Sequence, residues 1–202
     1  MISISSQEEF LNGVEEYEKH EKRDSMYKVS TFFVSHFWGR FADMADGLGV
    51  LLLTWNQAFY RYGVFDFDEL EQCIDRNFKK LEDYRNRDIF SLTASDEKEI
   101  KSIFNDFLDA LKLRNETTQK TSPVAVAKAL HILAPNFFPL WDKRIAEAYG
   151  LKFKKPAEEY FTFCKISKYI AEKIKDFIVQ PQKPILRLID QYNYAKYTKE
   201  WI

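Results

Sequence analysis

Apolar residues recur every three or four positions along most of this chain, and this spacing constrains the fold more than any other feature. One such stripe follows Ser95 and consists of Ile100, Ile103, Phe104, Phe107, Leu108 and Leu111. Only six Gly and six Pro occur in 202 residues, which argues against a β-sandwich built on many tight turns. We therefore predict an all-α fold, an irregular array of eight or nine helices.

Helix start and stop signals divide the chain into these elements. The segment from Ser6 to Glu9 has the capping-box pattern, and Ser122-Pro123 combines an N-cap residue with proline at the first helical position. Gly47 and Gly49 predict a break before an apolar helix that runs from Val50 to Arg61.

Residues 28–34 leave two alternatives open. Their β-branched and aromatic content indicates a strand, whereas the four-residue spacing of Phe33, Phe37 and Phe41 favours a helix that begins near Thr31. Further along, Pro156 predicts the start of a long basic helix that reaches about Val179.

Charge is unevenly distributed between the two halves of the chain. Residues 1–110 contain 13 basic and 22 acidic side chains, a net charge of −9, whereas residues 111–202 contain 17 and 9, a net charge of +8. We expect one α-helical domain over residues 1–202, with the option of an acidic and a basic lobe on either side of a cleft. The basic half predicts a surface for a polyanion. Alternatively, the two halves simply attract each other.

The sequence contains no pattern typical of a metal centre or of a membrane protein. Cys73 and Cys164 lie far apart and outside any Cys- or His-rich motif, so neither a zinc site nor a disulfide framework is predicted. Residues 1–9 lack the basic and apolar blocks of a signal peptide, and the apolar run from Leu48 to Trp55 is too short to cross a bilayer. We expect a reduced, cytoplasmic setting, no cofactor and no membrane partner.

The segment around Asp142 is the strongest candidate for chemistry. It reads Pro139-Leu140-Trp141-Asp142-Lys143-Arg144 and follows a short apolar helix that is predicted from Pro123 to Ala134. Asp142 stands where a turn leads into a new helix, and both a helix N-terminus and neighbouring cations favour an ionised carboxylate.

Two segments resemble the helix-hairpin-helix DNA glycosylases, which excise damaged bases. Residues 51–57 (LLLTWNQ) are similar to the early helix of that family, which ends in a Gln-bearing segment, and residues 138–145 (FPLWDKRI) are similar to its catalytic Asp motif. Their order and their separation of about 85 residues also match the family layout. The resemblance implies a glycosylase-like helical fold, duplex DNA as the partner, and Asp142 as the catalytic carboxylate.

The resemblance also implies roles for nine further residues. A base pocket is expected from Trp55, Asn56, Gln57 and Trp141, in which the indole rings stack on an extruded base. Contacts to DNA are expected from Lys120, Ser122, Lys128, Lys143 and Arg144.

The chain departs from the family pattern at three points. Residues 118–124 occupy the position of the family's glycine-containing hairpin but include no glycine. Lys128 lies about one helical turn beyond the position of the lyase lysine, and no four-cysteine cluster signature is present. The resemblance therefore implies a monofunctional or divergent member that cleaves N-glycosidic bonds without lyase chemistry.

Each of these residues also has a plainer interpretation. Asp142 is an ordinary N-cap residue in that case, Trp55 belongs to the core, and Gln57 is a surface amide. Lys128 and His131 then form a solvated helix edge. Correspondingly, the chain is either an active glycosylase, a catalytically inactive nucleic-acid-binding module with a role in genome defence, or a helical domain that binds other proteins.

Overall fold

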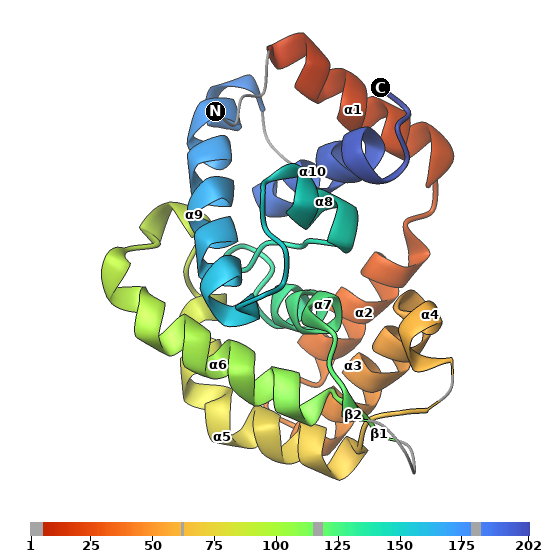
Figure 1. The fold of residues 1–202 in the computed structure, drawn as a ribbon, viewed down its shortest axis with the longest axis vertical. Helices are drawn as coiled ribbons and strands as arrows, with labels where there is room; N and C mark the ends of the chain where they lie inside the picture. The colour runs from red at the N-terminus through yellow and green to blue at the C-terminus, as the bar shows by residue number, and fades with distance from the viewer. Residues whose placement is uncertain (1–5, 62, 115–118, 179–182) are drawn as a thin grey trace.

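The computed structural model describes residues 6–61, 63–114, 119–178 and 183–202. The predicted all-α class is confirmed, because these ranges form ten α-helices and one minimal β-hairpin (Figure 1). The prediction was eight or nine helices. Among the described residues, no helix is both long and apolar enough to cross a bilayer.

The first half of the chain forms five α-helices that are followed by two 3₁₀ turns. The helices are α1 (Gln7–His20), α2 (Ser25–His36), α3 (Phe41–Trp55), α4 (Gln57–Tyr60) and α5 (Phe67–Arg85). The 3₁₀ turns cover Ile89–Ser91 and Ala94–Asp96.

The second half begins in α6 (Glu97–Ala110), which leads into the hairpin of β1 (Leu113–Arg114) and β2 (Gln119–Lys120). The remaining helices are α7 (Pro123–Leu133), α8 (Lys143–Ala148), α9 (Pro156–Ile174) and α10 (Ile185–Asn193). A 3₁₀ turn, Lys175–Phe177, follows α9, and a π-helical turn, Tyr194–Thr198, continues α10. Residue 179, the predicted end of the basic helix, lies outside the described residues.

The N-cap predictions at Ser6 and Ser122 are confirmed, whereas the cap predicted at Ser95 is wrong, because Thr93 and Asp96 form a capping box instead. Ser6 Oγ accepts the backbone N–H of Glu9 at 3.1 Å, and Ser122 Oγ accepts that of Ala125 at 3.2 Å. These bonds satisfy backbone donors that the first turn of a helix leaves unpaired. Local sequence therefore determines where α1 and α7 begin.

The prediction of a break at Gly47 and Gly49 was wrong, because both residues lie inside α3. A Cβ atom at Gly47 would lie 2.1 Å from the ring of Phe33, and one at Gly49 would lie 2.3 Å from the ring of Phe67. The glycines thus allow α2 and the start of α5 to approach α3 closely. The apolar segment ends instead at Asn56, which separates α3 from α4.

The strand alternative for residues 28–34 is also wrong, since they belong to α2. This helix begins at Ser25, six positions before the predicted start near Thr31. Asp24, which precedes it, has a left-handed backbone with φ of 45°.

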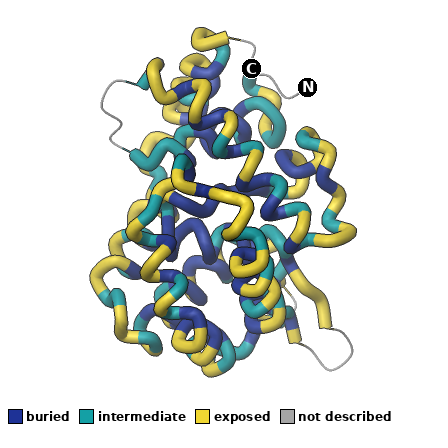
Figure 2. Tube along the Cα trace, turned by 90° about the vertical axis from the view of Figure 1, so that its left-hand side faces the viewer, coloured by how far each residue is buried: buried dark blue, intermediate teal, exposed yellow. Residues whose placement is uncertain are grey.

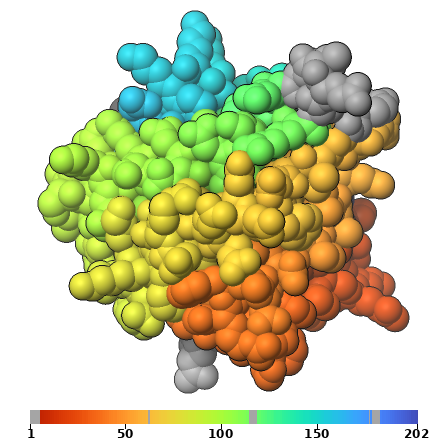
Figure 3. Space-filling model, turned by 90° about the horizontal axis from the view of Figure 1, so that it is seen from below, coloured from red at the N-terminus to blue at the C-terminus, as the bar shows by residue number. Residues whose placement is uncertain are grey.

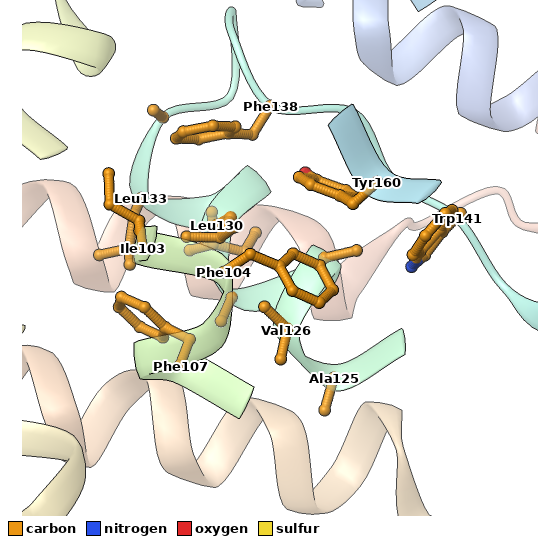
Figure 4. Close-up of a cluster of buried hydrophobic side chains, with 14 of the residues drawn as sticks. Ile103, Phe104, Phe107, Ala125, Val126, Leu130, Leu133, Phe138, Trp141 and Tyr160 are labelled. Atoms are coloured by element: carbon orange, nitrogen blue, oxygen red, sulfur yellow. The ribbon is translucent and has the colours of Figure 1, made fainter. Parts of the chain in front are cut away.

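A single hydrophobic core extends through both halves of the chain (Figure 2). Its aromatic centre places Phe104 of α6, Phe138 and Trp141 of the loop before α8, and Tyr160 of α9 around the buried face of α7 (Figure 4). Helix α10 packs against α1, and α9 packs against α6. The acidic and basic halves therefore interleave. Seen from below, α5 and α6 lie side by side across the surface (Figure 3).

Glu159 organises the loop between α8 and α9. Its carboxylate accepts the backbone N–H groups of the four consecutive residues Lys152 to Lys155 at 2.6–3.2 Å. Burial on its own raises the pKa of Glu159, but these four donors hold the pKa below its ordinary value of 4.5. The ionised form therefore binds the loop more tightly than the protonated form does.

We expect Glu159→Gln to lower the free energy of unfolding by about 1.5–3 kcal/mol at neutral pH, because charge-assisted hydrogen bonds are lost. Since the folded pKa is depressed, this contribution is complete above the unfolded pKa of 4.5 and disappears as the pH falls through the folded value. Urea unfolding of both proteins at neutral pH and well below pH 4.5 measures the difference. Glu158→Gln, a change at the exposed neighbour, serves as the control, and an equal loss at both pH values contradicts the prediction.

Candidate functional site

A cavity of about 260 Å³ lies between the α1–α2 corner, the end of α3, the middle of α7, the start of α8, and α10. Both halves of the chain line it. Four carboxylates and two cations belong to the lining, namely Glu21, Asp24, Asp142, Asp190, Lys128 and Arg187. The lining also includes four aromatic residues, which are Tyr17, Trp55, Trp141 and Tyr194.

Asp142 is the N-cap of α8, and hydrogen bonds hold both of its carboxylate oxygens. Oδ1 accepts the backbone N–H of Ile145 at 2.8 Å, and Oδ2 accepts the hydroxyl of Thr198 at 2.5 Å. Thr198 belongs to the π-helical turn, and its carbonyl oxygen accepts Arg144 Nη1 at 3.1 Å. The half-buried carboxylate thus has a defined orientation beside the cavity.

Lys128 extends from α7 into the same cavity. Its Nζ donates to the Trp55 carbonyl at 2.8 Å and lies 4.9 Å from the centre of the Trp55 ring. Burial lowers the pKa of the Lys128 amine to about 8, although Asp190 and Asp142 act to raise it. Lys128 was predicted as a DNA contact, and the structure places it inside the cavity wall.

The interpretation of Lys128 and His131 as a solvated helix edge is wrong. His131 is completely buried, with Nδ1 2.7 Å from the Phe138 carbonyl and Nε2 3.3 Å from the Tyr27 hydroxyl. Burial lowers the pKa of His131 to about 3, so this imidazole is neutral at physiological pH. The ring lies outside the cavity lining.

A buried ion network around Arg187 was not found from the sequence. Arg187 is 1% exposed and donates from Nη2 to Tyr17 Oη and to Asp24 Oδ1, both at 2.6 Å. It also pairs with Asp190, three residues further along α10. Its guanidinium lies 4.5 Å from the centre of the Tyr27 ring. Burial raises the pKa of Asp190 to about 6, although Arg187 acts to lower it.

Of the predicted base pocket, only the two tryptophans line the cavity. Trp55 is half-buried, whereas Trp141 is 1% exposed and donates from Nε1 to the Pro123 carbonyl at 3.0 Å. The Trp141 ring packs against Phe163 in the core. It also packs against Tyr160 (Figure 4). The predicted stacking role of Trp141 needs a correction, because no open ring face remains for a base.

The remaining predicted residues lie outside the cavity lining. Gln57 is exposed at the start of α4, and Asn56 Nδ2 donates to Ser122 Oγ at 3.2 Å. That bond ties the end of α3 to the start of α7, and Ser122 is 7% exposed. The Ser122 hydroxyl is thus engaged in structural bonds, which argues against its predicted phosphate contact.

The predicted cations of the surface are accessible. Lys120 is exposed on β2, and residue 118 of the same predicted DNA-binding segment lies outside the described residues. Lys143 is exposed at the start of α8, 3.8 Å from Glu147, and Arg144 follows it.

No protein-family model matches the chain, and neither the curated proteins nor the solved structures include a match to it. Within the described ranges, no group of three or more His, Cys, Asp or Glu side chains is arranged to hold a metal ion.

Proposed function

We propose that this protein cleaves the N-glycosidic bond of a base in DNA, with Asp142 as the catalytic carboxylate. One observation carries the proposal: a carboxylate with two fixed hydrogen bonds borders a cavity with aromatic walls. The resemblance of residues 51–57 and 138–145 to the glycosylase family points to the same chemistry.

The chemistry requires one negative charge near the sugar. As the C1′–N bond breaks, its electron pair moves to the base, and positive charge develops on the sugar ring. The Asp142 carboxylate stabilises this charge and accepts a proton from the water that adds to C1′.

The size of the cavity suits a single base. Ligand sites for drug-sized molecules measure about 300–1,000 Å³, and this cavity is slightly smaller at about 260 Å³. A base inside a duplex must leave the stack to enter it, at a cost of about a few kcal/mol. Contacts with Trp55 and Tyr194 would offset part of that cost. The exposed cations Lys143 and Arg144, next to Asp142 in the chain, would contact the DNA backbone.

Incubation with duplexes that carry a broad panel of base lesions tests the proposal. We expect release of a free base and an alkali-labile abasic site from at least one of them. Ser25 is exposed on the cavity wall, at the first position of α2, so Ser25→Trp should block the entrance and abolish release. Lys28→Trp adds the same side chain to an exposed position outside the lining and should leave release unchanged.

Failure of the whole panel, or equal release by both tryptophan variants, contradicts the proposal. Salt-dependent binding to the same duplexes without base release would favour the second candidate, a nucleic-acid-binding module without catalysis. This second candidate is supported by three exposed cations, which are Lys120, Lys143 and Arg144.

A further inference from the structure

Five exposed cations, which come from three segments far apart in the sequence, flank the cavity. They are Lys22 and Arg23 in the α1–α2 corner, Lys143 and Arg144 at the start of α8, and Lys199 after the π-helical turn. Glu21 and Asp24, on either side of the first pair, and Asp142, before the second pair, belong to the cavity lining. Lys199 Nζ lies 5.6 Å from the centre of the ring of Tyr194, which also lines the cavity. We call these five cations the basic rim.

Side-chain contacts hold the three segments of the basic rim together. Arg144 Nη1 donates to the Thr198 carbonyl at 3.1 Å, which joins the start of α8 to the C-terminal segment, residues 198–202. The ring of Trp201 stacks on that of His20, at the end of α1, with ring centres 4.0 Å apart and an interplanar angle of 20°. The C-terminal segment therefore bridges α8 and α1, and the rim exists before any partner binds.

Three of the rim cations are available to a partner. Lys22, Arg23 and Lys199 form no ion pair with any other described residue. Glu21 is exposed in the same corner and opposes them, but it offsets only one of the three charges. An anion at the rim therefore meets net attraction, whereas the lining of the cavity, with four carboxylates and two cations, repels it.

The other two rim cations have only weak partners. Lys143 Nζ lies 3.8 Å from Glu147, Arg144 Nη1 lies 3.4 Å from Glu200, and all four side chains are more than half exposed. Ion pairs of this kind contribute about 0–1 kcal/mol. A phosphate forms charge-assisted hydrogen bonds with Lys and Arg, so it can replace the carboxylates at little cost.

The backbone has a left-handed conformation directly after two of the rim cations. Asp24, which follows Arg23, has φ of 45°, and Glu200, which follows Lys199, has φ of 56°. Such a conformation costs a residue other than glycine about 1–2 kcal/mol. It persists where the surrounding structure fixes it, and residues of this kind cluster at ligand contacts. Arg23 and Lys199 thus lie in fixed turns and not in frayed helix ends.

We propose that the basic rim binds the phosphates of DNA on both sides of the nucleotide whose base enters the cavity. The inference rests on the proposed function for its setting, because that function brings DNA to the cavity. It assigns the grip on the backbone to the α1–α2 corner and the C-terminal segment, which lie outside both segments that resemble the glycosylases. Lys22, Arg23 and Lys199 are the new phosphate contacts in a chain that lacks the glycine hairpin.

Binding of a fluorescent duplex, followed by anisotropy over a series of salt concentrations, tests the proposal. Each phosphate contact contributes about 0.9 to the slope of log Kd against log salt concentration. The double variant Lys22→Gln/Arg23→Gln should therefore lower this slope by about 1–2 and weaken binding about tenfold or more at about 0.1 M salt. Lys199→Gln should lower the slope by about one.

Arg76→Gln/Lys79→Gln is the matched control. Both residues are exposed on α5, which lies in the lower part of Figure 1, whereas α1, α8 and α10 lie in its upper half. The control removes the same two charges and should keep the wild-type slope. Circular dichroism checks that each variant is folded.

A footprint on the unmutated protein gives an independent readout. Acetylation of lysines with and without the duplex, measured by mass spectrometry, should show that DNA protects Lys22, Lys143 and Lys199. Lys79 and Lys98, which are exposed on α5 and α6, should be acetylated equally in both samples.

An equal slope for the wild type and the Lys22→Gln/Arg23→Gln variant, or an equal loss in the control, would overturn the inference even if the protein releases bases. Absence of duplex binding by the wild type, or binding to phosphatidylserine vesicles but not to DNA, would overturn it too. A reduced slope and protection of the rim, without base release from any duplex, would support the inference and count against the proposed function.

Discussion

Asp142→Asn should lower the rate of base release by about 100- to 1,000-fold while the fold is retained, if the carboxylate acts as proposed. Asn is as effective an N-cap residue as Asp, so the bond to the Ile145 N–H and the start of α8 are preserved. The substitution removes the negative charge and the capacity to take a proton. Single-turnover kinetics on the duplex that the wild-type protein cleaves measure the effect, and circular dichroism checks the fold.

Two further variants separate charge from capping. Asp66 is also an N-cap, at the start of α5, and it lies outside the cavity lining, so Asp66→Asn should leave base release unchanged. Asp142→Ala should lose both the charge and the cap, with a cost of about 1 kcal/mol in unfolding free energy. A rate for Asp142→Asn within about twofold of wild type would remove Asp142 from the mechanism.

Arg187→Met should give the largest loss of stability, about 3–5 kcal/mol, because it leaves Asp24 and Asp190 buried without their cation. Domains of this kind have about 5–15 kcal/mol of stability in total, so the loss is a large fraction. Urea unfolding monitored by tryptophan fluorescence measures it. Arg23→Met, a change at an exposed arginine in the α1–α2 connection, should change the stability by less than about 0.5 kcal/mol.

A triple variant tests whether unpaired negative charge causes the loss of stability. Adding Asp24→Asn and Asp190→Asn to Arg187→Met removes the uncompensated charges, so stability should partly return. It also keeps the prediction testable if the single variant does not fold. If the triple variant is less stable than Arg187→Met, the loss comes from packing of the arginine side chain and not from unpaired charge.

Features that depend on neighbouring residues were predictable from the sequence. Asp142 and Ser122 each begin a helix because their side-chain oxygen accepts the backbone N–H of the residue three positions later. This interaction is local in the sequence. The all-α class follows from the apolar spacing for the same reason. The prediction of a helix break at Gly47 was wrong because glycine is needed there for tertiary packing. The ring of Phe33, in another helix, occupies the space of a Cβ atom.

The cavity itself was only partly predictable. Asp142 and Trp55 were candidates by resemblance, whereas the exposure of Gln57 and the burial of Trp141 depend on how α4 and α9 pack. The orientation of Lys128 depends on which side of α7 faces the cavity. The Arg187 network joins residues 163 positions apart, and no local pattern in the sequence signals such a pair.

The residues that line the cavity lie far apart in the sequence, and this separation affects the order in which the cavity can form during translation. Asp24 leaves the ribosome before its partner Arg187, which is translated 163 positions later. Until α10 and the π-helical turn emerge, a nascent chain has no Arg187 to neutralise Asp24 and no Thr198 to orient Asp142. Closure of so long a loop is slow compared with helix formation. Assembly of the cavity therefore has to follow translation of α10 and of the π-helical turn.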